Sequence, residues 1–181
     1  MKYDSTFDTQ SHIIQVRNLM FYAIHNLLLR SHDHDYSKLE SPEKELFDQF
    51  TPLLRETTYG SPEYKQALES MGVALEHHYA ENSHHPEHFG YAECNICFKH
   101  YPRDYGECCQ ACGNGMFTLR PDVSGMSLLD LIEMLADWKA AGMRHANGNL
   151  AESLKINKER FEISDQLFAI IENTAKELGW L

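Results

Sequence analysis

Apolar residues recur every three or four positions along most of the chain, which is the spacing of one face of an α-helix. The first such stretch predicts a helix over about residues 11–30. The side chains expected to face inward from it are His12, Val16, Leu19, Phe21 or Met20, Ala23 and Leu27. A Ser-Pro-Glu sequence at 41–43 is a helix start, because serine caps a helix and proline is tolerated at its first position. The following Thr51-Pro52 either kinks this helix or opens another.

The same pattern continues through the second half of the chain. A second Ser-Pro-Glu sequence at 61–63 starts a helix predicted to run to about Glu81, and Pro86 then ends helical structure. One face of that helix holds Leu68, Met71, Leu75 and His78. Further helices are predicted over 128–141, 150–160 and from Ser164 to the break at Gly179. The expected fold is therefore all-α.

Residues 91–122 differ in composition from everything around them. This stretch holds all five cysteines, together with two prolines, three glycines and several aromatic residues. We interpret it as a small inserted module, with residues 1–90 and 123–181 forming one helical domain around it.

Two CxxC pairs within this module indicate a zinc site. Cys94 and Cys97 form the first pair, and Cys109 and Cys112 form the second after a gap of 11 residues. Each pair can turn two thiolates toward one ion, and two pairs complete the tetrahedral shell that Zn²⁺ prefers. A closed four-sulfur shell has no open position, which is typical of a structural knuckle or ribbon site. Three alternatives stay open: Cys108 or His100 as a replacement ligand, a redox CxxC, and reduced core cysteines.

Composition and charge limit the function classes. Hydrophobic residues make up 43% and charged residues 24%, and the formal net charge is −11 with 16 scattered Lys and Arg. This balance disfavours binding to a nucleic-acid duplex. No apolar run approaches the ~20 residues that cross a bilayer, and the first ten residues are polar, so we expect a cytoplasmic protein without a membrane partner.

Histidine and acidic residues gather in separate parts of the chain. The chain has 11 histidines, and most lie within residues 31–36 and 75–89. Imidazole and carboxylate ligands together leave coordination positions for water, which suits metal-assisted hydrolysis. The candidates from these segments and from the later helix are His12, His34, Asp35, His78, His84, His85, Glu133 and Asp137.

The order His, His-Asp, Asp resembles the HD-domain superfamily of metal-dependent phosphohydrolases. His12 resembles its first histidine, His34-Asp35 its signature doublet, and Asp137 its closing aspartate. More closely, residues 34–38, 82–88 and 130–139 look like an uncharacterised phage and bacterial family with HDxSK and NxHHPEH segments. The resemblance implies an HD-like helical bundle. It also implies a second divalent ion (Mn²⁺, Mg²⁺, Fe²⁺, Co²⁺ or Zn²⁺) on His12, His34, Asp35 and Asp137, with His78, His84 and His85 near it.

We therefore expect a hydrolase of a nucleotide or another small phosphate ester. Lys38 would contact the phosphate and assist catalysis, Glu133 would support the site, and Arg160 would be a second phosphate contact. Simpler readings compete: His12 as a core histidine, Lys38 as an exposed lysine, and Arg160 in a surface ion pair. The rival functions are a non-enzymatic interaction protein, with a partner or second copy bound through the zinc module, and hydrolysis of a non-phosphate substrate.

Overall fold

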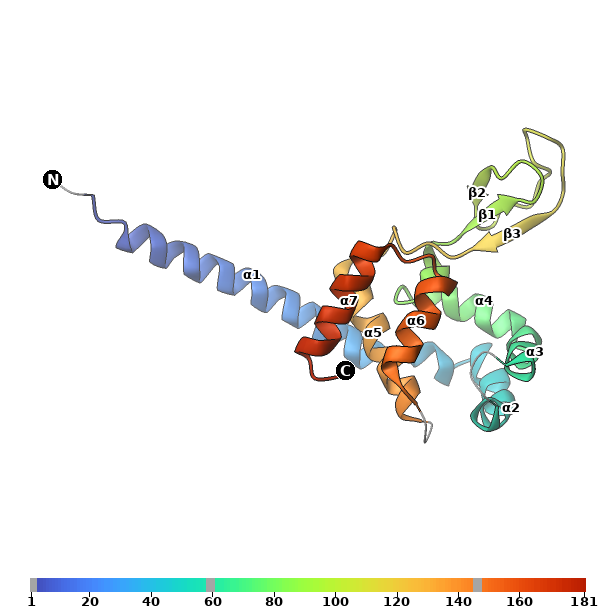
Figure 1. Ribbon diagram of the computed structural model, residues 1–181, viewed down its shortest axis with the longest axis horizontal. Helices are drawn as coiled ribbons and strands as arrows, with labels where there is room; N and C mark the ends of the chain where they lie inside the picture. Colours follow the sequence, from blue (N-terminus) through green and yellow to red (C-terminus); the bar gives the residue numbers. More distant parts are fainter. Residues whose placement is uncertain (1–2, 58–60, 145–147) are drawn as a thin grey trace. The chain divides into compact units, whose positions relative to one another are not determined.

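The computed structural model describes residues 3–57, 61–144 and 148–181 of the chain (Figure 1). The chain is mostly helical, as the sequence predicted, and it also carries one small antiparallel sheet. It forms two compact units, Met1–His34 and Asp35–Leu181. None of the described helices is long and apolar enough to cross a membrane.

The first unit is a single helix, α1 (Thr6–Asp33), which extends beyond the predicted 11–30 at both ends. No proline or glycine interrupts this stretch, so nothing in the local sequence stops the helix earlier. The sequence predicted that His12, Val16 and Leu19 face inward. That prediction is wrong, because none of the residues Thr6–Asp33 is buried and these three side chains are exposed. In the structure, residues 1–34 form a compact unit of their own, and α1 is its single helix.

The second unit begins with the short 3₁₀ helix η1 (Tyr36–Leu39), followed by α2 (Glu43–Glu56), α3 (Pro62–Ser70) and α4 (Gly72–Glu81). Helix α2 contacts η1, α3 and α4. Pro52 lies inside α2 without ending it. The single helix predicted over 61–81 is instead two helices that meet at Met71. Ser61 caps α3 as predicted, since its Oγ accepts from the backbone N of Tyr64 at 3.2 Å.

The cysteine-rich module follows a 3₁₀ helix, η2 (Pro86–Phe89), and holds the strands β1 (Tyr91–Cys94), β2 (His100–Pro102) and β3 (Phe117–Arg120). The sheet order is β2-β1-β3, with both pairings antiparallel (Figure 1). These strands lie within 91–122, as predicted. A Cβ at Gly90 would come within 2.7 Å of the Arg120 carbonyl oxygen, so glycine allows the two edges of the module to meet.

The C-terminal helices α5 (Leu128–Met143), α6 (Leu150–Arg160) and α7 (Asp165–Glu177) enclose the main apolar core. Its buried members are Met134, Leu135, Leu150, Leu154, Phe161, Ile163, Ile171 and Ala175. Ser127 and Asp130 form a capping box at the start of α5, and Gly179, at φ +68°, follows the end of α7 as predicted. The capping box fixes the start of α5, the helix that also carries Glu133 and Asp137.

Candidate metal centres

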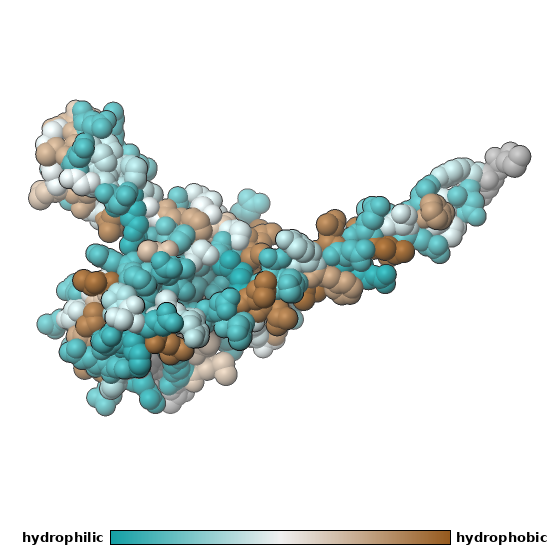
Figure 2. Space-filling model, turned by 180° about the vertical axis from the view of Figure 1, so that it is seen from behind, coloured by the Kyte–Doolittle hydropathy of each residue, from teal (hydrophilic) through white to brown (hydrophobic). Residues whose placement is uncertain are grey.

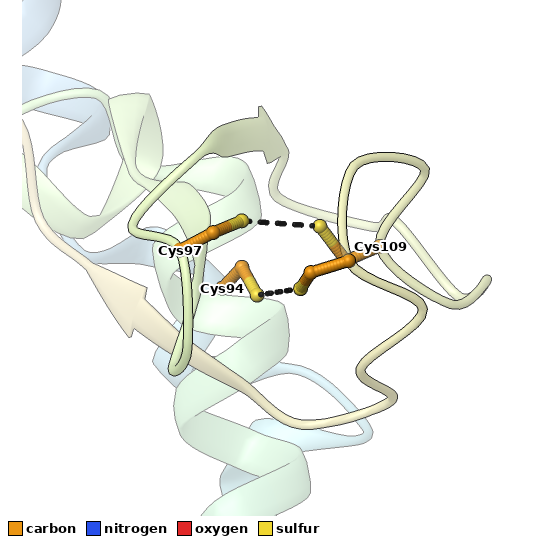
Figure 3. A group of neighbouring side chains, drawn as sticks. Cys94, Cys97 and Cys109 are labelled. Atoms are coloured by element: carbon orange, nitrogen blue, oxygen red, sulfur yellow. Dashed lines mark hydrogen bonds between the residues drawn. The ribbon is translucent and has the colours of Figure 1, made fainter.

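Four cysteine sulfurs gather in the module, and those of Cys94 and Cys97 face the second CxxC pair (Figure 3). Sγ of Cys94 lies 3.6 Å from Sγ of Cys112, and Sγ of Cys97 lies 3.4 Å from Sγ of Cys109. Sulfurs that are each about 2.3 Å from one tetrahedral zinc ion lie about 3.8 Å apart. The four sulfurs are thus close enough together to hold a zinc ion, which is the ligand set that the CxxC spacing predicted.

The two CxxC pairs share one backbone shape. The residue after each pair, Phe98 or Gly113, has a positive φ of 57° or 72°. Its backbone N donates to the carbonyl oxygen of the first cysteine of the pair, at 2.9 Å for Cys94 and 2.7 Å for Cys109. This turn points both thiols of a pair to the same side, and the glycine in the second turn avoids the strain that Phe98 accepts.

Electrostatics in the cysteine cluster also favour a cation. The Tyr101 hydroxyl lies 3.1 Å from Sγ of Cys109, and this hydrogen bond lowers the pKa of Cys109 to about 6. A backbone hydrogen bond from Asn114 lowers the pKa of Cys112, but burial and the neighbouring thiols outweigh it and raise this pKa to about 12. All four sulfurs therefore become thiolates together only when a positive ion neutralises them.

Both alternative ligands lie outside this cluster. The four clustered thiols are Cys94, Cys97, Cys109 and Cys112, and Cys108 is exposed. His100 stacks on Tyr91 at 4.1 Å between ring centroids, and its Nε2 lies 3.4 Å from a carboxylate oxygen of Glu93. The geometry thus selects Cys109 over Cys108 and leaves His100 in a surface contact.

A second group of potential ligands lies where η1, α4 and the following loop meet. Asp35, His78, His84 and His85 each offer one ligand atom, and these atoms lie within 4.8 Å of one another. Nε2 of His78 lies 2.9 Å from Nε2 of His85, while Oδ1 of Asp35 lies 3.4 Å from Nε2 of His78 and 3.5 Å from Nε2 of His84. Ligand atoms about 2.0–2.1 Å from one ion lie about 2.8–3.4 Å apart for bond angles between 90° and 109°. The spacing of the group matches that of ligands on a single ion.

Two carboxylates hold the imidazoles in one orientation. Oε2 of Glu43 lies 2.9 Å from Nδ1 of His78, and Oε1 of Glu133 lies 3.1 Å from Nδ1 of His84. Because a carboxylate only accepts hydrogen bonds, these contacts place the proton of each ring on Nδ1. The Nε2 lone pairs then face Asp35, which is the arrangement found around metal-ligating histidines.

Glu43 anchors this arrangement from a fully buried position at the first residue of α2. Its other oxygen, Oε1, lies 2.8 Å from Nδ1 of His77. Asn82 adds a further support, because its Nδ2 donates to the His78 carbonyl oxygen at 2.8 Å and to Ser37 Oγ at 2.9 Å. The sequence argument did not select Glu43, since its Ser-Pro-Glu context indicates only a helix start.

The pKa values of the imidazoles follow from burial and nearby charge. Burial, followed by the Lys38 charge, lowers the pKa of His78 to about 4. Burial and the neighbouring His84, His78 and Lys38 lower the pKa of His85 to about 2. Burial also lowers the pKa of His84, but its hydrogen bonds to Asp35 and Glu133 outweigh this and raise it above the usual range. His78 and His85 are therefore neutral at pH 7, the state in which imidazole binds a metal.

Lys38 lies beside the group and is held there. Its Nζ is 2.5 Å from Oδ2 of Asp35 and 5.1 Å from the centre of the Phe47 ring. Asp35 itself has a left-handed backbone with φ 57°, a conformation that aspartate tolerates better than most residues. This turn begins η1 and brings Lys38 back over the carboxylate three residues earlier.

Acidic side chains of α5 face the same region. A carboxylate oxygen of Asp137 lies within 4.8 Å of one of Asp35, and Glu133, one turn earlier, contacts His84 as described above. Asp130 lies in the first turn of α5, and it also accepts from Ser83 Oγ at 2.6 Å. This last bond fixes the loop that carries His84 against the start of α5.

Two of the predicted site residues, His12 and Arg160, lie outside this group. His12 is near the start of α1, and His34, 22 positions later, directly follows its end, so the two are separated by about 33 Å along the helix axis. One chain therefore cannot place both on one ion, which corrects the four-ligand set drawn from the resemblance. His34 ends the first unit and directly precedes Asp35, the first residue of the second. Nη2 of Arg160 pairs with Oε1 of Glu87 at 2.7 Å, the surface ion pair considered above.

Comparison with known proteins places the chain in a family. The model of a family of unknown function, DUF5662, matches residues 1–177, so the chain belongs to that family. No curated protein and no solved structure matches it.

Proposed function

We propose that this member of the DUF5662 family is a metal-dependent phosphohydrolase that acts on a nucleotide or another small phosphate ester. The observation that carries the proposal is the group of Asp35, His78, His84 and His85, whose ligand atoms lie within 4.8 Å of one another. The buried imidazoles of His78 and His84 are each held by a carboxylate, and such a group is costly to assemble in a protein interior unless it serves a ligand.

The donor set fits a divalent ion of the first transition series. Imidazole nitrogens with one carboxylate suit Mn²⁺, Fe²⁺, Co²⁺ or Zn²⁺ better than Mg²⁺, which prefers oxygen alone. When bound, such an ion would polarise a phosphoryl oxygen and acidify a water molecule. Asp137 extends the acidic side of the group and would hold the same ion or a second one.

The chain's own residues supply the remaining roles in the proposed hydrolysis. Glu43 and Glu133 keep Nε2 of His78 and His84 directed at the ion, so both are positioning residues rather than catalytic ones. Lys38 would move from Asp35 to a phosphate oxygen once an ion neutralises that carboxylate. Water then adds to phosphorus, the ester P–O bond breaks, and the leaving alcohol takes up a proton.

A second proposal concerns the fold. We propose that the chain from the His34-Asp35 doublet onward is HD-like, with Asp137 as the closing aspartate. The departure at His12 means that one ligand of the usual pattern is replaced here, and His78, His84 and His85 offer three replacements. The phosphohydrolase class rests on that resemblance, whereas the metal-binding capacity rests on the geometry.

The test is a phosphate-release assay with purified protein, nucleotides and a generic phosphate monoester, supplemented in turn with Mn²⁺, Co²⁺, Mg²⁺ and Zn²⁺. We expect release with the wild type and a loss of at least about a hundredfold with Asp35→Asn. Asp33→Asn is the matched control, because this exposed aspartate lies only two positions away. Absence of release with all substrates and ions, from a protein that binds the second metal, would overturn the catalytic proposal.

A second candidate function is protein binding through the zinc module. Exposed apolar side chains favour it: Ile96, Phe98, Met116 and Leu119 are 63%, 66%, 63% and 51% exposed. A non-enzymatic adaptor would retain zinc, lack phosphate release and lose its partner on Phe98→Ser. A Phe98→Ser protein with normal zinc content and unchanged partner binding would count against this candidate.

A further inference from the structure

The cysteine-rich module has almost no apolar interior. Of residues 91–122, all of which the structure describes, only Ala92, Cys94 and Cys109 are buried. Figure 2 (upper left) shows hydrophilic and hydrophobic residues mixed over the face of the module that is in view. A segment of this size without a core keeps its shape through a bound metal and a few specific contacts. The contacts around the four cysteines therefore control how well the module holds an ion.

The sheet holds the first CxxC pair directly. Cys94 is the last residue of β1, and its backbone N donates to the Lys99 carbonyl oxygen at 2.9 Å, just before β2 begins. The second pair, Cys109 and Cys112, lies between β2 and β3 within residues 103–116, which form no strand. Contacts other than the strand ladder must therefore hold the second pair against the sheet.

Two tyrosine hydroxyls make such contacts. The hydroxyl of Tyr101, a residue of β2, lies 3.1 Å from Sγ of Cys109. A metal-bound thiolate has no proton and only accepts hydrogen bonds, so the tyrosine is the donor whenever an ion is bound. The Tyr105 hydroxyl donates to the Cys108 carbonyl oxygen at 3.0 Å. Both hydrogen bonds therefore reach the start of the second CxxC pair.

Aromatic packing restricts the positions of both hydroxyls. The rings of Tyr101 and Tyr105 stack with their centroids 4.3 Å apart and their planes at 24°. Phe117, from β3, packs edge-on against both rings, at 5.6 Å from Tyr101 and 5.5 Å from Tyr105. Because β2 and β3 are the two outer strands of the sheet, this cluster joins the second CxxC pair to both of them.

We propose that Tyr101 and Tyr105 are positioning residues of the zinc centre. They hold the second CxxC pair against the sheet, and Tyr101 also donates a hydrogen bond to the thiolate of Cys109. The proposal rests on the zinc site and not on the phosphohydrolase function. A hydrogen bond to a ligating sulfur withdraws electron density from it, so its loss changes both the metal affinity and the electronic spectrum of the centre.

Cobalt substitution in the full-length protein tests the role of Tyr101. Co²⁺ bound to thiolates gives a sulfur-to-metal charge-transfer band in the near ultraviolet, and displacement of this band by Zn²⁺ reports the zinc affinity of the cysteine site alone. Tyr101→Phe keeps the ring and removes the hydroxyl. We expect the zinc dissociation constant to rise about tenfold and the band to move to longer wavelength. Tyr91→Phe is the matched control and should change neither, because Tyr91 stacks on His100 at the other end of β1 from Cys94.

Tyr105→Phe separates the two roles. This change removes a hydrogen bond to a backbone carbonyl and leaves the contact to sulfur, so the zinc affinity should fall about tenfold while the band stays in place. An unmoved band in Tyr101→Phe, or unchanged zinc affinity in either variant, would overturn the proposal. An equal band shift in Tyr105→Phe would also overturn it, because the shift would then report a general loosening of the pair. A wild-type protein whose Co²⁺ complex lacks the band would remove the zinc site itself, and the proposal with it.

Discussion

Nδ1 of His78 lies 2.9 Å from Oε2 of Glu43, although the two residues are 35 positions apart in the sequence and come from different helices. Both side chains are almost completely buried. The carboxylate fixes the imidazole so that its other nitrogen faces Asp35 and His85. The group of potential metal ligands therefore depends on a residue outside it.

Replacing Glu43 with Gln should weaken metal binding at the Asp35 group by about 10- to 100-fold, since the oriented acceptor behind His78 loses its charge. Isothermal titration with Co²⁺ measures this affinity. Glu45→Gln is the control, because Glu45 lies two residues away on α2 and is exposed. Equal Co²⁺ affinity in both variants would show that Glu43 has no role in positioning His78.

Serine at both Cys94 and Cys97 should remove one zinc ion per chain, since the remaining two thiols cannot form a closed shell. Elemental analysis of the purified protein gives the zinc content. Cys108→Ser should retain the full zinc content, because Cys108 lies outside the cluster. Equal zinc loss in both proteins would mean that the ligand set is wrong.

Loss of zinc should also weaken the second site. The backbone N of Asp122 donates to the Pro86 carbonyl oxygen at 3.0 Å, next to His85. Unfolding of the module releases this contact and loosens the loop that carries His84 and His85. We expect the Cys94→Ser/Cys97→Ser protein to bind Co²⁺ at the Asp35 group about tenfold more weakly than Cys108→Ser does. Unchanged affinity would indicate that the two centres are independent.

The metal-free protein should lose stability as the pH falls below about 6.5. The pKa of His78 is about 4 and that of His85 about 2 in the folded chain, whereas both return to about 6.5 on unfolding. The unfolded chain therefore binds more protons in this window, and the free energy of unfolding falls by up to about 1.4 kcal/mol per pH unit for each imidazole. His84 opposes this, because its raised pKa gives a contribution that is present at low pH and lost as the pH rises.

Urea denaturation of the metal-stripped protein between pH 4 and 7 measures this dependence. His85→Asn should reduce the slope, because the folded chain then no longer excludes a proton at that position. His100→Asn, at an exposed histidine of the zinc module, should leave the slope unchanged. A slope that is the same in all three proteins would contradict the assignment to His85.

The sequence by itself determined the features that depend on near neighbours. The position of each CxxC pair is set by spacing within four residues, so the clustered cysteines Cys94, Cys97, Cys109 and Cys112 could be chosen from the sequence. Helix starts depend on one capping residue, which is why Ser61 and Ser164 could be identified from the sequence. The change in composition marked residues 91–122 as a separate module, and all three strands lie within it.

The tertiary structure decided which distant residues meet. A long uninterrupted helix keeps His12 about 33 Å from His34, a separation that a motif order cannot reveal. Glu43 became a support of His78 only because α2 packs against α4. A glutamate in the first turn of a helix can equally well be exposed to solvent, and nothing near Glu43 in the sequence indicates His78 as its partner. The burial of a side chain and its contacts with distant residues depend on how whole helices pack. Helix caps and CxxC turns depend on a few adjacent residues. The sequence therefore predicted the caps and turns, whereas the contacts between distant residues had to be observed in the structure.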